Sequence, residues 1–216
     1  MKYLAAVGLA FSALVVVPGT ASAVPVVCNE PGDAGGFLAS AASCLGTVDQ
    51  IQGQFGGGNP HADMYQITIA PGGGFSATTV GGAVWDTQLF LFDAAGLGIA
   101  ANDDSAAGQQ STLPLGNPLL ASLPGGIYYL AISHFDNDPL SPGGLIFPIA
   151  LATDVIGPTG PGGGLAINDW SSNADGGGQY TIFLTGTGEP IPEPGTLLLV
   201  GSGIAALALR CRRRYS

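Results

Sequence analysis

Between its two ends, the chain alternates apolar and polar residues with the two-residue period of β-strands. Tyr65, Ile67 and Ile69, which are separated by residues of different character, are the clearest example. Other strand-like segments, bounded by Gly- or Pro-rich turns, cover residues 75–80, 85–93, 127–133, 145–152 and 180–185. The 3.6-residue period of a helix is absent here. The pattern therefore predicts an all-β fold, an antiparallel β-sandwich with a jelly-roll-like arrangement.

The predicted strands all lie in one stretch of the chain. Residues 61–188 hold them, so we expect the β-sandwich domain there. Residues 24–60 are loop-rich and include consecutive glycines. Together the two parts comprise about 170 residues, which is enough for one domain with a sizeable core.

The N-terminus has the pattern of a secretory signal. Lys2 precedes an apolar run from Leu4 to Val17, and the small-residue sequence Ala21-Ser22-Ala23 follows. A basic start, a short apolar run and an A-x-A ending are typical of a signal peptide. We therefore expect signal peptidase to remove residues 1–23 and the mature chain to begin near Val24.

The C-terminus carries three features in a fixed order, which together occupy residues 189–216. Pro192-Glu193-Pro194 comes first, an apolar segment over 196–209 follows, and an arginine cluster ends the chain. The cluster comprises Arg210, Arg212, Arg213 and Arg214. Basic residues after an apolar segment stay in the cytoplasm, so 196–209 is expected to form a transmembrane helix. The segment is shorter than the roughly 20 residues of a usual transmembrane helix. Snorkelling arginines and local thinning of the bilayer can offset this difference in length.

This order of features resembles the PEP-CTERM sorting signal of Gram-negative bacteria. The resemblance implies processing by an exosortase near Pro192–Pro194 and delivery to the cell surface or extracellular matrix. It also implies that the protein is only transiently anchored in the inner membrane, through its C-terminal segment. It does not indicate what the delivered domain does.

The distribution of charge excludes several functions of the exported body. All five Lys and Arg residues lie in the terminal segments, whereas all fifteen acids lie between Glu30 and Glu193. The exported body therefore has a formal charge of −15, with histidines neutral. Without cations it cannot neutralise phosphates, so nucleic-acid binding is excluded, and no arginine is present to clamp an anionic substrate. The acids must be solvated, hydrogen-bonded or bound to metal cations.

Cys28 and Cys44 are the two cysteines of the exported body, because Cys211 lies in the C-terminal tail. A pair of cysteines in an oxidising compartment favours a disulfide. A zinc site would need further Cys or His ligands nearby, and the nearest histidine in sequence is His61.

A second resemblance lies in the body of the chain. Residues 86–96, followed by Asn102-Asp103-Asp104, resemble the D-T-x-L-x-L-F-D strand and N-D-D loop of bacterial pre-peptidase C-terminal (PPC) domains. Residues 123–132 and 180–186 are similar to two further strands of that family. The resemblance implies a β-sandwich accessory domain that in some members binds calcium. The chain departs from the family in lacking a protease domain and in carrying a long insertion, residues 134–178.

Acidic and amide residues around the first matched strand form the best candidate site. They are Asp86, Asp93, Asn102, Asp103 and Asp104. Calcium is bound by six to eight oxygens of carboxylates, amides and carbonyls, so this set could hold Ca²⁺. The alternative is that Asp and Asn only cap turns. A weaker candidate, Asp136-Asn137-Asp138, lacks the glycine and distal glutamate of an EF-hand and is interpreted as a solvated loop.

The sequence provides no complete set of catalytic groups. His134 with nearby Asp136 is the best available acid–base pair, and no G-x-S-x-G motif occurs in the body. We therefore expect a protein that is not an enzyme. Trp170, in the insertion, could stack on a sugar ring, as could Trp85, Tyr128 and Tyr129. The alternative for each is core packing.

Together these patterns predict an exported, non-catalytic protein of the cell surface or extracellular matrix. Its expected role is structural or adhesive, in association with exopolysaccharide. A calcium-dependent carbohydrate-binding module is the alternative, and a secreted hydrolase is the third hypothesis.

Overall fold

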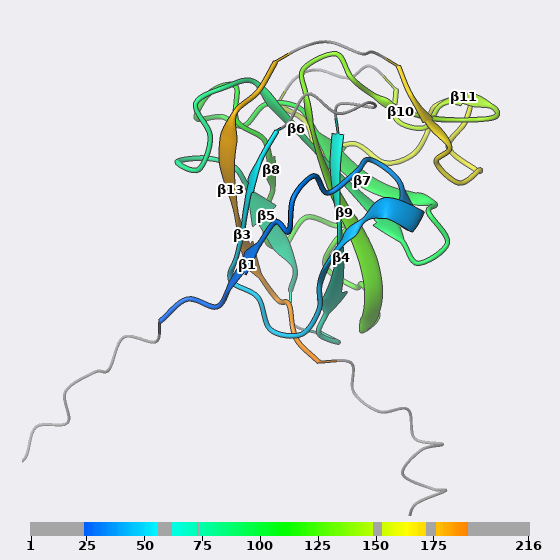
Figure 1. Ribbon diagram of the computed structural model, residues 1–216. Coiled ribbons are helices and arrows are strands. Elements are labelled where there is room, and N and C mark those ends of the chain that lie inside the picture. Colours follow the sequence, from blue (N-terminus) through cyan, green and yellow to red (C-terminus); the bar gives the residue numbers. More distant parts are fainter. Residues whose placement is uncertain (1–23, 56–61, 73, 149–152, 172–175, 190–216) are drawn as a thin grey trace, which may run out of the picture.

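Two five-stranded β-sheets face each other in the computed structural model, which describes residues 24–55, 62–72, 74–148, 153–171 and 176–189 (Figure 1). The first sheet has the order β1 (Val27–Asn29), β3 (Gln50–Gln54), β13 (Gln179–Thr185), β5 (Ser76–Thr78) and β8 (Thr112–Leu113). The second has the order β2 (Ala42–Cys44), β4 (Ala62–Ile69), β9 (Gly126–His134), β6 (Thr87–Asp93) and β7 (Gly98–Asn102). The all-β sandwich predicted from the sequence is confirmed.

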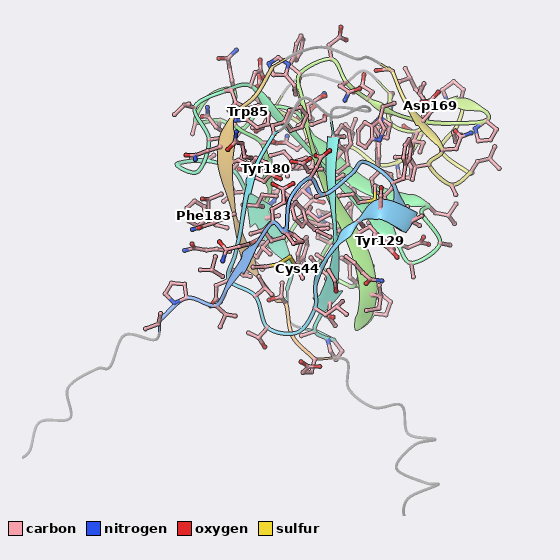
Figure 2. All side chains as sticks on the ribbon, viewed as in Figure 1. Cys44, Trp85, Tyr129, Asp169, Tyr180 and Phe183 are labelled. Carbon is pink, nitrogen blue, oxygen red and sulfur yellow. A yellow bond between two sulfur atoms is a disulfide. The ribbon has the colours of Figure 1, made fainter. Side chains whose placement is uncertain are left out.

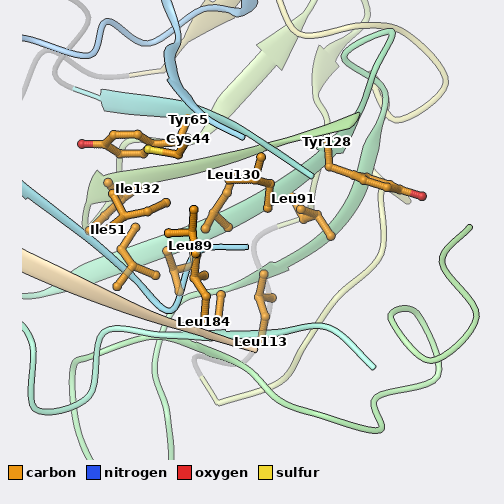
Figure 3. Close-up of a cluster of buried hydrophobic side chains, with 14 of the residues drawn as sticks. Cys44, Ile51, Tyr65, Leu89, Leu91, Leu113, Tyr128, Leu130, Ile132 and Leu184 are labelled. Atoms are coloured by element: carbon orange, nitrogen blue, oxygen red, sulfur yellow. The ribbon is translucent and has the colours of Figure 1, made fainter. Parts of the chain in front are cut away.

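The main core fills the space between the two sheets. β13 shows the alternation that this requires, because Tyr180, Ile182 and Leu184 are buried whereas the residues between them face outward. These side chains meet those of the second sheet, where Leu89 and Leu130 are fully buried (Figure 3). Burial of such aliphatic side chains is the main force that holds the sheets together.

The outer face of the second sheet is covered by a second core. Phe90 and Phe92 of β6 point to this side, with their rings 5.7 and 6.0 Å from that of Phe147. The covering segment includes a small sheet of β11 (Gly144–Leu145), β10 (Pro139–Ser141) and β12 (Asp169–Trp170). The segment predicted to be an insertion, residues 134–178, therefore supplies most of the layer that buries this face, and it is called the covering segment below.

Two strand predictions need correction. Residues 24–60 were expected to be loop-rich, but they contain β1, β2 and β3 and a short 3₁₀ helix, Leu38–Ser40. β1 pairs with β3 and β2 with β4 in parallel, so the sheets are mixed rather than wholly antiparallel. The strand expected over 145–152 is only the two-residue β11, after which residues 146–148 are not in a strand. Ile146 and Phe147 instead pack into the second core, and residues 149–152 lie outside the described residues.

The predicted disulfide between Cys28 and Cys44 is present, with the two Cα atoms 5.7 Å apart. Cys28 lies on β1 and Cys44 on β2, which are edge strands of different sheets. The bridge therefore joins the two layers of the sandwich, as well as closing a loop near the N-terminus.

The strand pairings define two opposite ends of the sandwich. β4 begins at Ala62, opposite Ser133, and ends at Ile69, which forms a bridge with Thr187. The chain therefore leaves toward its sorting tail at the Ile69 end (Figure 1). Because β4 has eight residues, the other end lies about 25 Å away.

Among the residues described, no helix is long and apolar enough to cross a membrane. The predicted signal peptide, residues 1–23, and the predicted transmembrane helix, residues 196–209, both lie outside that part of the chain.

Candidate metal site

Three of the predicted calcium ligands come together at the end of the sandwich opposite the sorting tail. One carboxylate oxygen each of Asp86, Asp103 and Asp104 lies within 4.8 Å of the others. Asp86 directly precedes β6, and the two other aspartates directly follow β7. Since β6 and β7 are antiparallel neighbours, the start of one strand lies beside the end of the other. Strand pairing therefore produces the cluster.

Asn102 holds this end of β7 in place. Its side chain is buried, with Oδ1 accepting a hydrogen bond from the Thr112 backbone N–H at 2.7 Å. Its Nδ2 donates to the Asp154 carbonyl at 3.1 Å. Both ends of the amide are thus used within the protein, and Asn102 positions the two aspartates that follow it.

Two carboxylate oxygens in the cluster have no hydrogen-bond partner among the described residues. Asp86 Oδ1 and Asp103 Oδ1 are buried and accept no hydrogen bond from the described part of the chain. The other oxygen of Asp86, Oδ2, accepts from Gln109 Nε2 at 2.9 Å. Burying a carboxylate oxygen without a partner is costly, and a bound cation would remove that cost. This donor set therefore fits a hard cation that prefers oxygen ligands.

The electrostatics of the cluster lead to the same conclusion. The pKa of Asp103 is raised to about 7, first by burial and then by the neighbouring carboxylates of Asp104, Asp86 and Asp138. The pKa of Asp86 is also raised, first by burial and then by Asp104. A divalent cation would stabilise the ionised forms, because an opposite charge within a few ångströms favours ionisation.

A cavity of about 90 Å³ adjoins the cluster and shares Asp103 with it. Asp136, Asp138 and Asp154 also line the cavity, while Phe90 and Phe147 from the second core form apolar parts of its wall. The Asp136–Asp138 segment was interpreted from the sequence as a solvated loop, and this is wrong for its last two residues. Asn137 is buried, and Asp138 accepts a hydrogen bond from Gln88 Nε2 at 3.3 Å.

Asp93 does not belong to the cluster. It lies at the far end of β6, where Oδ1 accepts hydrogen bonds from the backbone N–H groups of Ala95 and Leu97, both at 2.9 Å. Asp93 thus stabilises the β6–β7 turn, and the turn alternative considered for the acidic residues holds at this position.

Trp170 is not available to a ligand, contrary to its candidate role. It is 5% exposed, its ring contacts Phe90 edge-on at 5.7 Å, and Nε1 donates to the Gly36 carbonyl at 2.9 Å. Trp170 therefore belongs to the second core, where its indole N–H has the partner that a buried tryptophan requires.

A second group of buried polar residues was missed by sequence analysis. Asp63, 2% exposed, accepts a hydrogen bond from the hydroxyl of Tyr180, which is itself hydrogen-bonded to the hydroxyl of Tyr65. Burial raises the pKa of Asp63 to about 7. The Asp63 carboxylate also lies near those of Glu30 and Asp33, but both Glu30 oxygens accept backbone hydrogen bonds. No local sequence signal indicates this group, because Asp63 and Tyr180 are 117 residues apart.

Comparison with known families identifies the C-terminal segment. Residues 190–214 match the PEP-CTERM protein-sorting motif. The PEP-CTERM motif marks an exported protein that an exosortase sorts and processes, so the predicted sorting signal is confirmed. Its residues Pro192, Glu193, Pro194 and the arginines lie outside the described part of the chain. Comparison with curated proteins gave no significant match. The PPC resemblance of the body stays a prediction.

The raised pKa values predict that, without metal, the protein is more stable at mildly acidic than at alkaline pH. In the folded protein the pKa values of Asp103 and Asp63 are about 7, against 3.8 for a free aspartate. The folded state therefore binds more protons than the unfolded state between these values, and stability falls as pH rises through about 7. In chelator, the melting temperature should be several degrees higher at pH 5 than at pH 8.

Two variants separate the sources of this pH dependence. Asp63→Asn should remove the part of the pH dependence that arises outside the cluster. Asp103→Asn should remove the part that arises within the cluster. A melting temperature in chelator that rises from pH 5 to pH 8 would contradict the assignment.

Proposed function

We propose that the exported body is a non-catalytic protein of the cell surface or matrix whose β-sandwich binds calcium. Its role is structural or adhesive, in association with exopolysaccharide. The observation that carries the calcium site is the convergence of Asp86, Asp103 and Asp104, with two buried carboxylate oxygens that lack partners among the described residues. The sorting motif supports the location of the protein outside the cytoplasm.

The geometry favours calcium binding over glycoside hydrolysis, which is the other function considered for carboxylates in this protein. Glycoside hydrolysis uses a pair of carboxyl groups that flank the scissile bond. Here the oxygens of three carboxylates lie within 4.8 Å of one another, as they do around one ion. Calcium accepts irregular cages of oxygen, whereas magnesium requires near-octahedral geometry. These arguments support a binding site and count against the hydrolase hypothesis.

The position of the cluster suits a surface protein. It lies at the end of the sandwich away from the point where the chain leaves toward the sorting motif. While the C-terminus is attached to the membrane, this acidic end can therefore face the surrounding matrix. A calcium ion held there could stabilise the exposed loops or link the protein to anionic groups of a neighbouring polymer.

One observation favours a calcium-dependent carbohydrate-binding module as the second candidate. The cavity next to the cluster shares Asp103 and carries further carboxylates that could accept hydrogen bonds from hydroxyl groups. In this case calcium would be required for glycan binding as well as for stability. A glycan array probed with and without calcium separates this candidate from a purely structural role.

Calcium is expected to stabilise the exported protein. An ion that binds only the folded state at one hundred times its dissociation constant adds about 2.7 kcal/mol to the free energy of unfolding. For a domain of this size, that corresponds to a rise in melting temperature of about 5–10 °C. Differential scanning calorimetry should show this rise with calcium, and a smaller one with magnesium or with sodium chloride at equal ionic strength.

The double variant Asp103→Asn, Asp104→Asn should lose the calcium-specific rise. Asp49→Asn with Asp169→Asn is the matched control, since it removes two exposed aspartates that belong to neither group of converging carboxylates. The control should retain the full response to calcium. Equal shifts in the melting temperature of the unchanged protein with calcium and with sodium chloride would show that both salts act only by screening charge. The calcium proposal would then fail.

A further inference from the structure

The outer face of the first sheet carries a row of amide side chains. Along β3, Gln50, Gln52 and Gln54 alternate with inward-facing residues, so the three glutamines share the outer face. On the neighbouring strand β13, Gln179 pairs with Gln54, and Thr181 pairs with Gln52. The amides and hydroxyl thus lie side by side across two strands.

A groove of about 600 Å³ runs over this part of the sheet. It is lined by residues of β1, β3 and β13 and by Gly82, whose carbonyl accepts a hydrogen bond from the Thr181 N–H at 2.8 Å. Gly82 packs directly against β13, since a Cβ atom there would clash with the Thr181 carbonyl oxygen. The groove is on the opposite side of the first sheet from the main core and is separate from the acidic cavity.

Most of the amides in the groove are free to bind a ligand. The side chains of Asn29, Gln54 and Gln179 are exposed and make no hydrogen bond to the described residues. Gln52 makes one, in which Nε2 donates to Gln50 Oε1 at 3.3 Å. Each primary amide offers two donors and an acceptor with two lone pairs. The face therefore presents alternating donors and acceptors, which matches the hydroxyl groups of a sugar chain.

The groove carries little net charge, although the exported body has no Lys or Arg to balance its acids. Glu30 is the one carboxylate among the residues that line it. Both Glu30 oxygens are already used, accepting backbone N–H groups of Ala34 at 2.7 Å and Gln54 at 2.8 Å. An anionic polymer would be repelled by the protein as a whole, and a cationic one would be attracted to the acidic end. An uncharged, hydroxyl-rich polymer fits this face best.

An aromatic ring completes the surface. Phe183 follows Gln179 and Thr181 on the outer side of β13, whereas Tyr180 points into the sandwich (Figure 2). Phe183 is partly exposed and lies beside Gly82, 3.1 Å from the position that a Cβ atom would take there. A partly exposed ring next to hydrogen-bonding groups can pack against the apolar face of a sugar ring.

We propose that this face, formed by Asn29, Gln52, Gln54, Gln179, Thr181 and Phe183, binds an uncharged polysaccharide chain. This inference rests on the proposed association with exopolysaccharide. It deepens that proposal by naming the class of polymer and the surface that binds the polymer. Binding here needs no calcium, because the groove shares no residue with the Asp86 cluster.

Affinity electrophoresis of the exported protein tests the proposal. The gels contain a neutral β-glucan, a neutral galactomannan or anionic polygalacturonate, each with calcium and with chelator. At least one neutral polymer should retard the protein equally in both conditions, and polygalacturonate should not retard it in chelator. Gln54→Ala with Gln179→Ala should weaken binding about tenfold, as expected for the loss of two hydrogen bonds. Neither glutamine makes a side-chain hydrogen bond to the described residues, so melting temperature should change little.

Gln66→Ala is the matched control, since it removes an amide from the second sheet, where Gln66 donates to the Tyr129 hydroxyl. It should bind the neutral polymer as the unchanged protein does. The proposal is overturned if neither neutral polymer retards the protein, if polygalacturonate retards it as strongly in chelator, or if the double glutamine variant binds normally. Retardation that requires calcium and is lost in Asp103→Asn, Asp104→Asn would instead place the glycan at the acidic cavity. Failure of the calcium melting shift alone leaves this proposal unaffected, so the two can fail separately.

Discussion

Replacing Trp170 with alanine is expected to lower the free energy of unfolding by about 3–5 kcal/mol, the range for loss of a large aromatic side chain from a core. The indole is 5% exposed and packs against Phe90 under the second sheet. Its removal also leaves the Gly36 carbonyl without the hydrogen bond from Nε1. Urea unfolding followed by circular dichroism measures the loss, which corresponds to a fall in melting temperature on the order of 10 °C.

Phe135→Ala is the control for this experiment. Phe135 belongs to the same covering segment but is 48% exposed, so its loss should cost little stability. If Trp170→Ala unfolded like the unchanged protein and only its polysaccharide binding fell, the indole would be a ligand-binding group, as first considered from the sequence.

Removing the disulfide by replacing both Cys28 and Cys44 with alanine is expected to cost about 3 kcal/mol. The two cysteines are 16 residues apart in sequence, and closing a loop of about 15 residues is given this value by the chain-entropy model. The bridge joins edge strands of the two sheets, so its loss also frees the N-terminal strands to separate from the sandwich. The expected fall in melting temperature is about 6–12 °C.

Reduction of the unchanged protein provides the internal comparison. The melting temperature of the reduced protein should approach that of the double variant, and the reductant should leave the variant unaffected. Equal melting temperatures of the oxidised protein and the variant would show that the bridge contributes nothing to stability.

The two proposed binding sites differ in charge and lie on different parts of the sandwich surface. The acidic cluster and its cavity occupy the end distant from the sorting tail, where burial and mutual repulsion raise the pKa of Asp103 and Asp138. The amide groove lies on the outer face of the first sheet. A protein without internal cations can therefore hold a metal ion at one place and a neutral polymer at another, without the two ligands competing.

Strand positions were predictable where the residue pattern is local. β4, β6, β9 and β13 lie within one or two residues of the segments expected from the sequence. The short strands β1, β2 and β3 were missed, because three to five residues give too little alternation to recognise. β4 and β6 are buried on both faces, because the main core covers their inner face and the second core covers their outer face. The alternation of residues therefore located these strands but did not show that their outer face is covered.

The sequence by itself determined the C-terminal sorting signal, the charge of the body, the all-β class and the cysteine pair. Each of these depends on composition or on the order of neighbouring residues, which the chain displays before it folds. The match to the sorting motif at residues 190–214 and the bond between Cys28 and Cys44 agree with this.

Only the tertiary structure decided which polar residues act together. Pairing of β6 with β7 brought Asp86 to Asp103 and left Asp93 at the opposite end of the strand. Folding of the insertion over the second sheet buried Trp170, and pairing of β3 with β13 aligned Gln54 with Gln179. These contacts join residues far apart in the chain, and their formation depends on the register of strand pairing and on the packing of layers. No local pattern encodes either, because the same alternation of residues is compatible with several neighbours in a sheet.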